Sequence, residues 1–203
     1  MASRPLPKGR GEEPYDVWEA VRGMSIGVDI PTLETERLRM RAWRQEDHGP
    51  FADFCANEAT ARFVGGACSR EDAWRRIATQ IGHWALRGYG SWVLEEKASG
   101  DWVGYSGLWR PDGWPEPEVM WGLAADAQGR GYATEAARRA RAFAYDELGW
   151  TTAISCIAPE NLPSQRVAER LGAKREGEIE LRGHRAGIYR HPGRETLNRN
   201  LQS

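Results

Sequence analysis

The 203-residue sequence has no apolar run long enough to cross a membrane, and its first residues lack the apolar stretch of a secretory signal. It also has little excess charge. Its 28 basic and 29 acidic residues give a formal net charge of -1, so no overall basic field attracts nucleic acid. These absences predict a cytoplasmic protein that binds neither membrane nor nucleic acid. The length suits one domain with a substantial core.

Cysteine and histidine are scarce and scattered. The three cysteines, Cys55, Cys68 and Cys156, match neither a disulfide framework nor a zinc spacing. The four histidines are His48, His83, His184 and His191. None lies at ligand spacing from a cysteine or another histidine, so no metal site is expected. Cys156 has no obvious base beside it in a predicted buried strand, and is interpreted as structural rather than nucleophilic.

Tryptophan is abundant, with ten copies. Six of them lie close together in the chain: Trp84, Trp92, Trp102, Trp109, Trp114 and Trp121. Aromatic side chains bury large areas, so most should belong to the core. A minority are expected to line an apolar or cationic substrate pocket, with Trp84, Trp109, Trp114 and Tyr105 as candidate walls.

Composition divides the chain into an extension at 1–30, a domain at 31–192 and a tail at 193–203. Hydrophobic periodicity predicts strands at 38–42, 91–96, 102–109, 118–124, 152–158, 175–182 and 185–190. It predicts helices over 44–63 (in two pieces around Pro50), 69–88, 132–148 and 161–171. The order βααβββαβαββ indicates an α+β fold with a partly parallel sheet.

The second helical segment has both of its end signals. Ser69 followed by Asp72 resembles an N-cap box, and Gly88 is placed to end the helix. Its buried stripe is predicted to be Ala73, Trp74, Ile77, Ala78, Ile81 and Ala85.

The segment that indicates chemistry runs from Asp126 to Ala136, between a strand and a helix. Gly129 and Gly131 let the backbone bend close to a ligand. The helix start then offers unpaired N–H groups and a positive dipole end, which suit phosphate. A dinucleotide fingerprint fails because Thr134 stands where Gly or Ala is needed, and an ATP loop fails for want of its Lys-Ser/Thr pair.

The sequence Gln128-Gly129-Arg130-Gly131-Tyr132-Ala133 resembles the (Q/R)-x-x-G-x-(G/A) pyrophosphate loop of the GNAT acetyltransferase superfamily. The segment from Asn161 to Ala173 resembles the later N-x-x-S motif of that family. The segment from Leu33 to Arg41 resembles the opening strand of its subgroup of ribosomal-protein N-terminal acetyltransferases. The resemblance spans about residues 33–190. It implies an acyl-CoA N-acyltransferase fold, with a mixed central sheet, splayed parallel strands and flanking helices.

The resemblance also implies acetyl-CoA as cosubstrate and no metal. The residues it assigns to cofactor binding are Leu123, Ala125, Gln128, Gly129, Arg130, Gly131, Tyr132, Ala133, Thr134, Asn161, Ser164 and Arg166. Leu123 and Ala125 would offer backbone groups to the pantetheine arm. Asn161 also suits a helix N-cap, and both roles are compatible. Arg138, Arg139 and Arg141 would either reach the nucleotide phosphate or form a solvated helix face.

The implied reaction moves an acetyl group to a primary amine by direct attack in a ternary complex. Glu118, at the start of the splayed strand, is the first candidate for the general base, and Glu116 is the alternative. A backbone N–H near Gly122 or Leu123 would act as an oxyanion hole. Many relatives carry a tyrosine acid seven residues after the asparagine, but here Ala168 occupies that position. Ser164 or a water is then left to protonate the leaving thiolate.

Three interpretations remain open. The first is an acetyltransferase acting on a protein N-terminus or on a small amine, with an acceptor pocket built from 44–86. The second is a CoA-binding sensor without turnover, which the missing tyrosine favours. The third is an interaction domain in which the turn at Gly129 and Gly131, the glycine turn, binds no ligand. Each is compatible with a homodimer.

Overall fold

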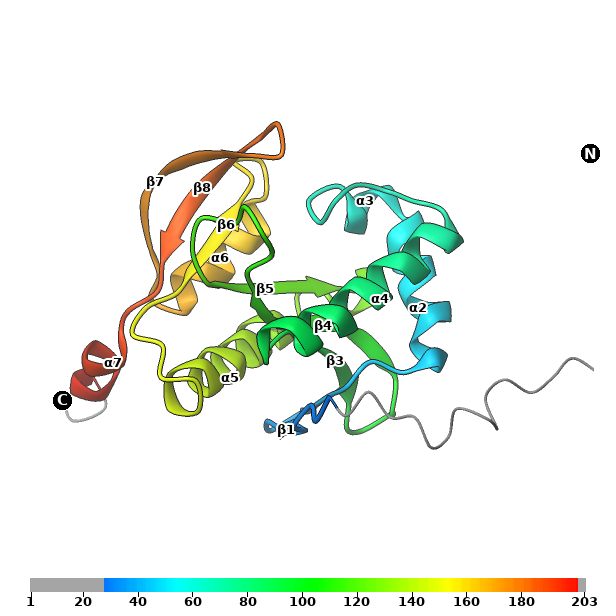
Figure 1. Cartoon of the computed structure of the whole chain (residues 1–203), viewed down its shortest axis with the longest axis horizontal. Helices are drawn as coiled ribbons and strands as arrows, with labels where there is room; N and C mark the ends of the chain where they lie inside the picture. The colour runs from blue at the N-terminus through cyan, green and yellow to red at the C-terminus, as the bar shows by residue number, and fades with distance from the viewer. Residues whose placement is uncertain (1–27, 201–203) are drawn as a thin grey trace, which may run out of the picture.

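The computed structural model describes residues 28–200, which are built around an eight-stranded mixed sheet (Figure 1). In spatial order the strands are β1 (Leu33–Glu34), β2 (Leu38–Arg41), β3 (Ser91–Glu96), β4 (Trp102–Trp109), β5 (Glu118–Leu123), β6 (Ile154–Ile157), β8 (His184–Arg190) and β7 (Lys174–Leu181). Every neighbouring pair is antiparallel except β5 and β6. The predicted α+β fold with a partly parallel sheet is confirmed.

Six α-helices and two short 3-10 turns connect these strands in the described residues. The helices are α2 (His48–Ala56), α3 (Glu58–Ala61), α4 (Arg70–Arg87), α5 (Tyr132–Asp146), α6 (Leu162–Arg170) and α7 (Arg194–Asn200); the turns are η1 (Gln45–Asp47) and η2 (Ala125–Ala127). No helix within residues 28–200 combines the length and hydropathy of a membrane span.

Helices cover both faces of the sheet. On β3, Trp92 and Leu94 point to one face, where they pack with α5, and Val93 points to the other, where it packs with α2 and α4. The α5 face is lined by small residues, among them Ala136, Ala137 and Ala140, all fully buried. Small side chains let this helix lie close to β4 and β5, which places its first turn at the end of β5.

The end signals of α4 act as predicted, but its buried face differs. The Asp72 N–H donates to Ser69 Oγ at 3.1 Å, and Gly88 ends the helix with φ 74°. Trp74 and Ile81, however, are 50% and 37% exposed, and Ala78 and Ala85 are exposed as well. The prediction that they belong to the buried stripe was wrong. The helix buries His83 and Trp84 as well as Ala73 and Ile77.

Two further boundaries differ from the prediction. Pro50 does not divide the first helical segment, because it lies in the first turn of α2, where its missing N–H costs nothing. The break falls at Asn57, whose side chain caps α3 by accepting from the Ala59 N–H at 2.9 Å. The predicted tail contains a helix, α7, whose Arg194 lies 3.0 Å from Asp146.

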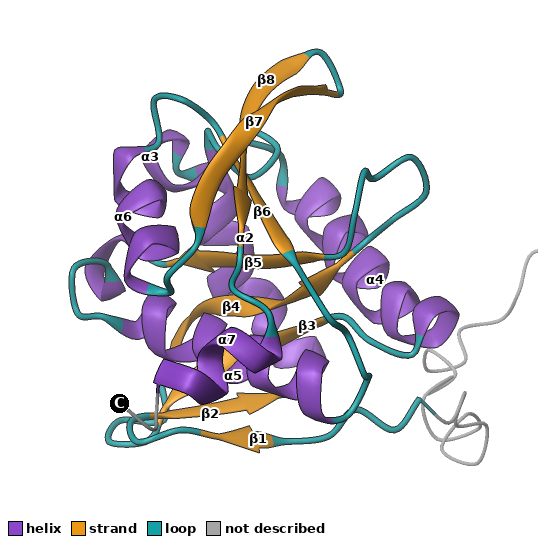
Figure 2. Cartoon of the chain, turned by 90° about the vertical axis from the view of Figure 1, so that its left-hand side faces the viewer, coloured by secondary structure: helices purple, strands orange, loops and turns teal. Residues whose placement is uncertain are grey.

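The two strands predicted to splay pair only once. Glu118 is the one residue of β5 registered with β6, opposite Ile154. Beyond it, Ser155 Oγ bridges to the Val119 carbonyl at 2.6 Å, and β6 turns away to pair with β8. Figure 2 shows β6, β7 and β8 rising out of the layer formed by β1–β5. The edge of β5 toward its Leu123 end therefore has no strand beside it.

Candidate functional site

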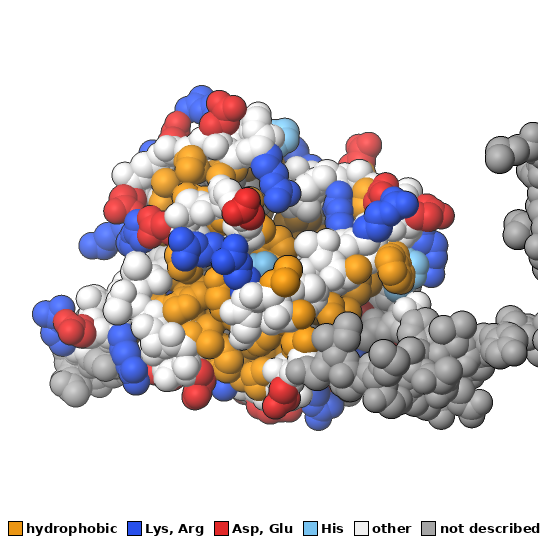
Figure 3. All heavy atoms as spheres, viewed as in Figure 1, with side chains coloured by type: hydrophobic (Ala, Val, Ile, Leu, Met, Phe, Trp, Pro, Cys, Tyr) orange, Lys and Arg blue, Asp and Glu red, His pale blue; other side chains and the backbone are white. Residues whose placement is uncertain are grey.

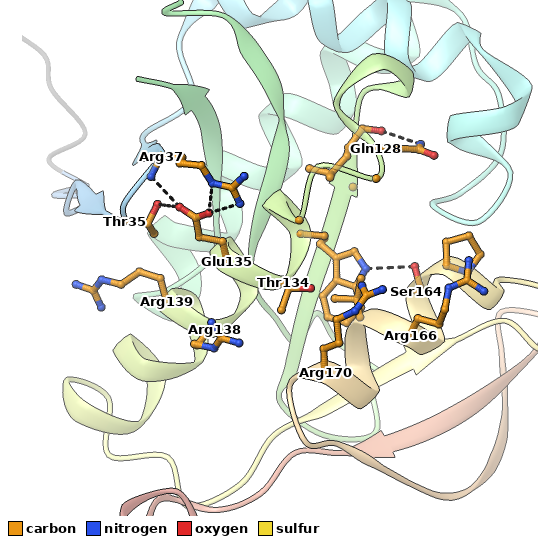
Figure 4. Close-up of a pocket in the computed structure, with 18 of the residues that line it drawn as sticks. Thr35, Arg37, Gln128, Thr134, Glu135, Arg138, Arg139, Ser164, Arg166 and Arg170 are labelled. Carbon is orange, nitrogen blue, oxygen red and sulfur yellow. Dashed lines mark hydrogen bonds and ion pairs between the residues drawn. The ribbon is translucent and has the colours of Figure 1, made fainter. Parts of the chain in front are cut away.

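Two cavities meet where β5 and β6 part. The first cavity, of about 1120 Å³, runs between the β1–β2 turn, the end of β5, the start of α5 and α6 (Figure 4). The second cavity, of about 1090 Å³, lies between α2–α3, the middle of the sheet and the β7–β8 hairpin. Five residues line both: Phe63, Val64, Trp121, Asn161 and Ser164. A molecule in one cavity could therefore meet a molecule in the other at this shared wall.

The glycine turn forms the floor of the first cavity. Gly129 and Gly131 have φ values of 75° and 86°, a conformation that favours glycine. The first backbone bond of α5 is the Glu135 N–H to the Gly131 carbonyl, so the N–H groups of the preceding turn have no helical acceptor. No side chain caps this end. The turn thus presents free donors and a positive dipole end, which suit an anion.

A buried hydroxyl at the same place has no partner. Thr134 is 9% exposed, and its Oγ1 makes no hydrogen bond within the described residues. The residue lines the first cavity, and Figure 4 shows it between α5 and α6. A buried polar group without a partner costs about 1–3 kcal/mol. An oxygen-rich ligand would remove that cost, so the residues present fit a phosphate group.

The backbone at the end of β5 points into the gap. The Ala124 N–H donates to the Val103 carbonyl of β4 at 3.1 Å. Backbone groups alternate along a strand, so those of Leu123 face the other way, toward the gap. The Leu123 carbonyl is met there by Gln128 Nε2 at 3.3 Å. An extended chain laid in the gap could pair with this edge. Ala125 has already entered η2, and its carbonyl accepts from the Gln128 N–H at 3.4 Å.

Arginines line the rim of the first cavity. Arg138 and Arg139 lie on α5, and Arg166 and Arg170 on α6 (Figure 4). None of the four has a carboxylate partner among residues 28–200. Arg141 is buried and donates to the Leu171 carbonyl at 2.6 Å. It therefore neither reaches a phosphate nor belongs to a solvated helix face, and both predictions for it were wrong.

Nine of the residues predicted to bind cofactor line the first cavity: Leu123, Gln128, Gly129, Gly131, Ala133, Thr134, Asn161, Ser164 and Arg166. The side chains of Arg130 and Tyr132 turn away and both contact Glu96. Ala125 is also outside the lining. These three can contribute through their backbone and the shape of the turn, but not through side chains that line the cavity.

One group of contacts was not foreseen. Glu135, in the first turn of α5, accepts from Thr35 Oγ1 at 2.6 Å, from the Arg37 N–H at 2.9 Å and from Arg37 Nε at 2.8 Å. The Arg37 guanidinium also donates to the Arg130 carbonyl at 2.9 Å. Burial tends to raise the pKa of Glu135, but these donors outweigh it and lower the pKa. We call Thr35, Arg37 and Glu135 the Glu135 clamp. It ties the β1–β2 turn to the glycine turn.

Asn161 and Ser164 begin α6 at the shared wall. The Asn161 Oδ1 accepts from the Ser164 N–H at 3.2 Å, which is the N-cap role. Ser164 Oγ accepts from Trp121 Nε1 at 3.2 Å (Figure 4). The indole N–H occupies one acceptor site of the Ser164 hydroxyl. The hydroxyl proton remains free to point into the cavities.

Glu118 lies in the second cavity and is 5% exposed. Its Oε1 accepts from the Cys156 N–H at 2.8 Å, and its Oε2 accepts from Trp114 Nε1 at 2.6 Å. Burial raises the pKa of this carboxyl to about 7, although both donors act against the rise. Glu116 differs, because Arg190 holds both of its oxygens, at 2.5 and 2.7 Å, and lowers its pKa.

Cys156 is half-buried beside Glu118. Burial and the neighbouring carboxylates raise the pKa of its thiol, so the thiolate needed for attack is disfavoured. His83 and His191 are buried too, and each bonds to protein groups: His83 to Tyr89 and Arg110, His191 to Ser155. Trp84, expected as a pocket wall, is 3% exposed in the core and lines neither cavity. Within residues 28–200, no three metal-ligating side chains gather.

The sequence and the fold resemble those of known proteins. Residues 37–174 match the model of an acetyltransferase (GNAT) domain. The uncharacterized N-acetyltransferase YnaD of Bacillus subtilis is 32% identical over 146 residues, which cover 71% of this chain and 84% of YnaD. An acetyltransferase from Agrobacterium tumefaciens superposes with a TM-score of 0.74 at 31% identity, covering 80% of this chain and 95% of that one. An aminoglycoside acetyltransferase in complex with coenzyme A shares the fold, with a TM-score of 0.68 at 18% identity, covering 81% and 98%.

Proposed function

The chain belongs to the GNAT acetyltransferase family and is an acetyl-CoA-dependent acyltransferase, and on this premise we propose that it acetylates a primary amine by direct transfer. The N–C bond to the acetyl group forms as the C–S bond breaks, the amine loses a proton, and CoA leaves as the thiol. The observation that carries the proposal is the buried carboxylate of Glu118 in the second cavity, which shares part of its lining with the first.

The first cavity is proposed to hold acetyl-CoA. The free N–H groups at the start of α5 and the Thr134 hydroxyl suit the pyrophosphate, and the arginine rim suits the nucleotide phosphate. The open edge of β5 near Leu123 suits the amide groups of the pantetheine arm. A solved acetyltransferase of the same fold binds coenzyme A, which supports this placement.

Glu118 is proposed to accept the proton of the attacking amine. With a pKa of about 7, the carboxyl is largely ionised just above neutral pH and still basic enough to take a proton. The Leu123 N–H, which faces the gap, is the backbone donor best placed for the carbonyl oxygen. Ser164, whose own proton is free, is proposed to pass a proton to the leaving sulfur while it takes one from water, so that the hydroxyl is restored and CoA leaves as the thiol.

We also propose residues 31–192 as the catalytic unit. The alternative function, a CoA-binding sensor without turnover, rests on Ala168 in place of the tyrosine acid. Ala168 is fully buried and can donate no proton. The sensor gives no reason for a buried carboxylate in a second cavity, and the Ser164 hydroxyl offers a substitute acid. We therefore favour the enzyme.

The binding half of the proposal is tested by calorimetric titration with acetyl-CoA. A side chain at Gly131 meets only the Arg37 guanidinium, at 3.3 Å, so Gly131→Glu places a negative charge on the anion site without a backbone clash. We expect affinity to fall at least about tenfold. Gly100→Glu is the matched control, because its φ of 80° is similar, its surroundings are open and it lines neither cavity. Equal binding by all three folded proteins would overturn the cofactor site.

The catalytic half is tested with Glu118→Gln and detection of released thiol. We expect kcat to fall about 100-fold or more while acetyl-CoA affinity stays unchanged. Acetyl-CoA binding by the wild type with no transfer to any amine would support the sensor instead.

A further inference from the structure

The second cavity has a lining that constrains its ligand. Its inner wall is largely aromatic. Phe51, Phe54 and Tyr105 form one cluster, with each phenylalanine ring centroid 5.8 Å from that of Tyr105, in edge-to-face contact. Trp109 and Trp114 continue the wall. Aromatic faces and edges bury an apolar or aromatic body well, and give few partners to hydroxyl groups.

Glu118 is the only buried carboxylate in this wall. The other two acids that line it, Glu160 and Glu178, are exposed at its margin. Glu178 is already engaged by the guanidinium groups of Arg175 and Arg185. The interior thus offers one anionic group, which is enough for one amine and no more. A molecule with several ammonium groups would leave all but one of them without a carboxylate partner in the interior.

Two arginines that have no carboxylate partner in the described part of the chain face each other across the entrance. Four arginines line the second cavity: Arg62, Arg76, Arg182 and Arg185. Arg62 and Arg182 have no carboxylate partner within residues 28–200; Arg62 lies over the Phe63 ring and Arg182 over the Trp114 ring, at 4.5 and 5.6 Å from the ring centroids. Arg62 follows α3 and Arg182 is at the tip of the β7–β8 hairpin, and Figure 3 shows basic side chains on both sides of the hollow between these segments.

We propose that the acceptor is a small monoamine with an aromatic or apolar body and an anionic group, such as a carboxylate, that meets Arg62 or Arg182. The amine approaches Glu118, the body lies against the aromatic wall, and the anion stays at the entrance. Polycations such as polyamines and aminoglycosides are disfavoured by the same charges. This inference rests on the proposed function and names the substrate class of its second cavity.

The test compares kcat/KM for five probe amines in a thiol-release assay: L-phenylalanine, L-phenylalaninamide, phenethylamine, spermidine and kanamycin. We expect turnover of the aromatic amines to exceed that of spermidine and kanamycin by at least about tenfold. Among the aromatic probes, phenylalanine should be favoured over its amide, which has the same body without the carboxylate. A pentapeptide with a free N-terminal alanine is included as a protein-like acceptor.

A variant with Arg62→Gln and Arg182→Asn should remove the preference for phenylalanine over phenylalaninamide and leave the amide unaffected. Asn is chosen at position 182 because φ there is 50°, which asparagine tolerates. Arg87→Gln, an exposed arginine outside both cavities, is the control.

Higher kcat/KM for spermidine, kanamycin or the peptide than for every aromatic probe would overturn the acceptor class and leave the transferase intact. If the protein binds acetyl-CoA but acetylates none of the aromatic probes, the acceptor class is overturned as well. If the folded wild-type protein does not bind acetyl-CoA, the proposed function itself is overturned. Calorimetry on the same preparation separates these outcomes.

Discussion

At the scale of single residues, Trp114 acts against the effect of burial on the pKa of Glu118. Its indole N–H donates to Oε2 at 2.6 Å, and a donor to a carboxylate favours the ionised form. Trp114→Phe keeps an aromatic ring and removes the donor, so the pKa of Glu118 should rise further above 7. The acidic limb of the pH profile of kcat/KM should then move to higher pH, with a loss of about tenfold at neutral pH.

The matched control is Trp109→Phe. Trp109 lines the same cavity but stacks on His83, at 4.5 Å between ring centroids, and makes no bond to Glu118. The acidic limb of the pH profile of kcat/KM should stay in place in Trp109→Phe. An unmoved limb in Trp114→Phe would argue against Glu118 as the group that titrates.

Thr134 gives a second prediction at this scale, with two readouts of opposite sign. Thr134→Val keeps the shape and removes the unpartnered hydroxyl, so the ligand-free protein should be as stable as the wild type or more stable by up to about 1 kcal/mol. Its affinity for acetyl-CoA should fall about tenfold. Thermal melting with and without acetyl-CoA measures both, and Thr134→Ser should restore binding. A destabilised free protein with unchanged affinity would make the hydroxyl structural.

Sequence alone identified these residues unevenly. Glu116 and Glu118 are two positions apart, and only the family resemblance favoured Glu118, because an isolated carboxylate in a sequence has no recognisable environment. Their difference comes from long-range partners, Arg190 for one and Cys156 with Trp114 for the other. Likewise Arg138 and Arg141 lie three residues apart on α5. Arg138 lines the first cavity, whereas Arg141 is buried and donates to the Leu171 carbonyl, a contact that the sequence does not show.

At the scale of elements, the Glu135 clamp fixes the start of α5 to the β1–β2 turn. Glu135→Gln removes the ion pair with Arg37 and weakens the hydrogen bonds from Thr35 and the Arg37 backbone. We expect a loss of about 1–2 kcal/mol in the free energy of unfolding. Acetyl-CoA affinity should also fall severalfold, since Arg37 holds the Arg130 carbonyl in the glycine turn.

Glu46→Gln is the control for the clamp, because Glu46 is exposed, lines neither cavity and forms no ion pair in the described residues. Denaturant unfolding and calorimetry on both variants give the comparison. Equal effects in the two variants would show that general charge, and not the clamp, is responsible.

Elements were the most predictable level of this fold. The ends of α4 follow from Ser69 and Gly88 because caps act through neighbours in the chain. Its exposed Trp74 and Ile81 were misassigned, since periodicity gives the apolar stripe but not how much of it the sheet covers. The glycine turn was visible for the same local reason, whereas the clamp joins residues about 100 positions apart and leaves no local pattern.

At the scale of the whole molecule, the site depends on how two sheet halves meet. β1 to β5 form one antiparallel half, β6 to β8 the other, and one registered pair joins them. The family resemblance implied the splay, which was confirmed, but the sequence did not reveal that both cavities share a wall at Trp121. That wall depends on the relative tilt of the halves, which no local pattern encodes.

The free energy of unfolding should depend on pH through two buried groups, Glu118 and His191, whose pKa values shift in opposite directions. Burial raises the pKa of Glu118 from 4.5 to about 7, so the folded state binds the proton more tightly than the unfolded state. Its contribution is present below pH 4.5 and is lost as pH rises toward 7. Burial lowers the pKa of His191 from 6.5 to about 3, so its contribution is present above 6.5 and is lost as pH falls toward 3.

Between pH 4.5 and 6.5 the two slopes oppose each other, each at most about 1.4 kcal/mol per pH unit, and the wild type should change little from these groups. Glu118→Gln removes one slope, so the free energy of unfolding of the variant should rise with pH across this window relative to the wild type. Urea denaturation at intervals from pH 4.5 to 7 measures the difference. A constant offset between the two proteins would mean that Glu118 is ionised in the folded state throughout, and its assignment as a base with a raised pKa would fail.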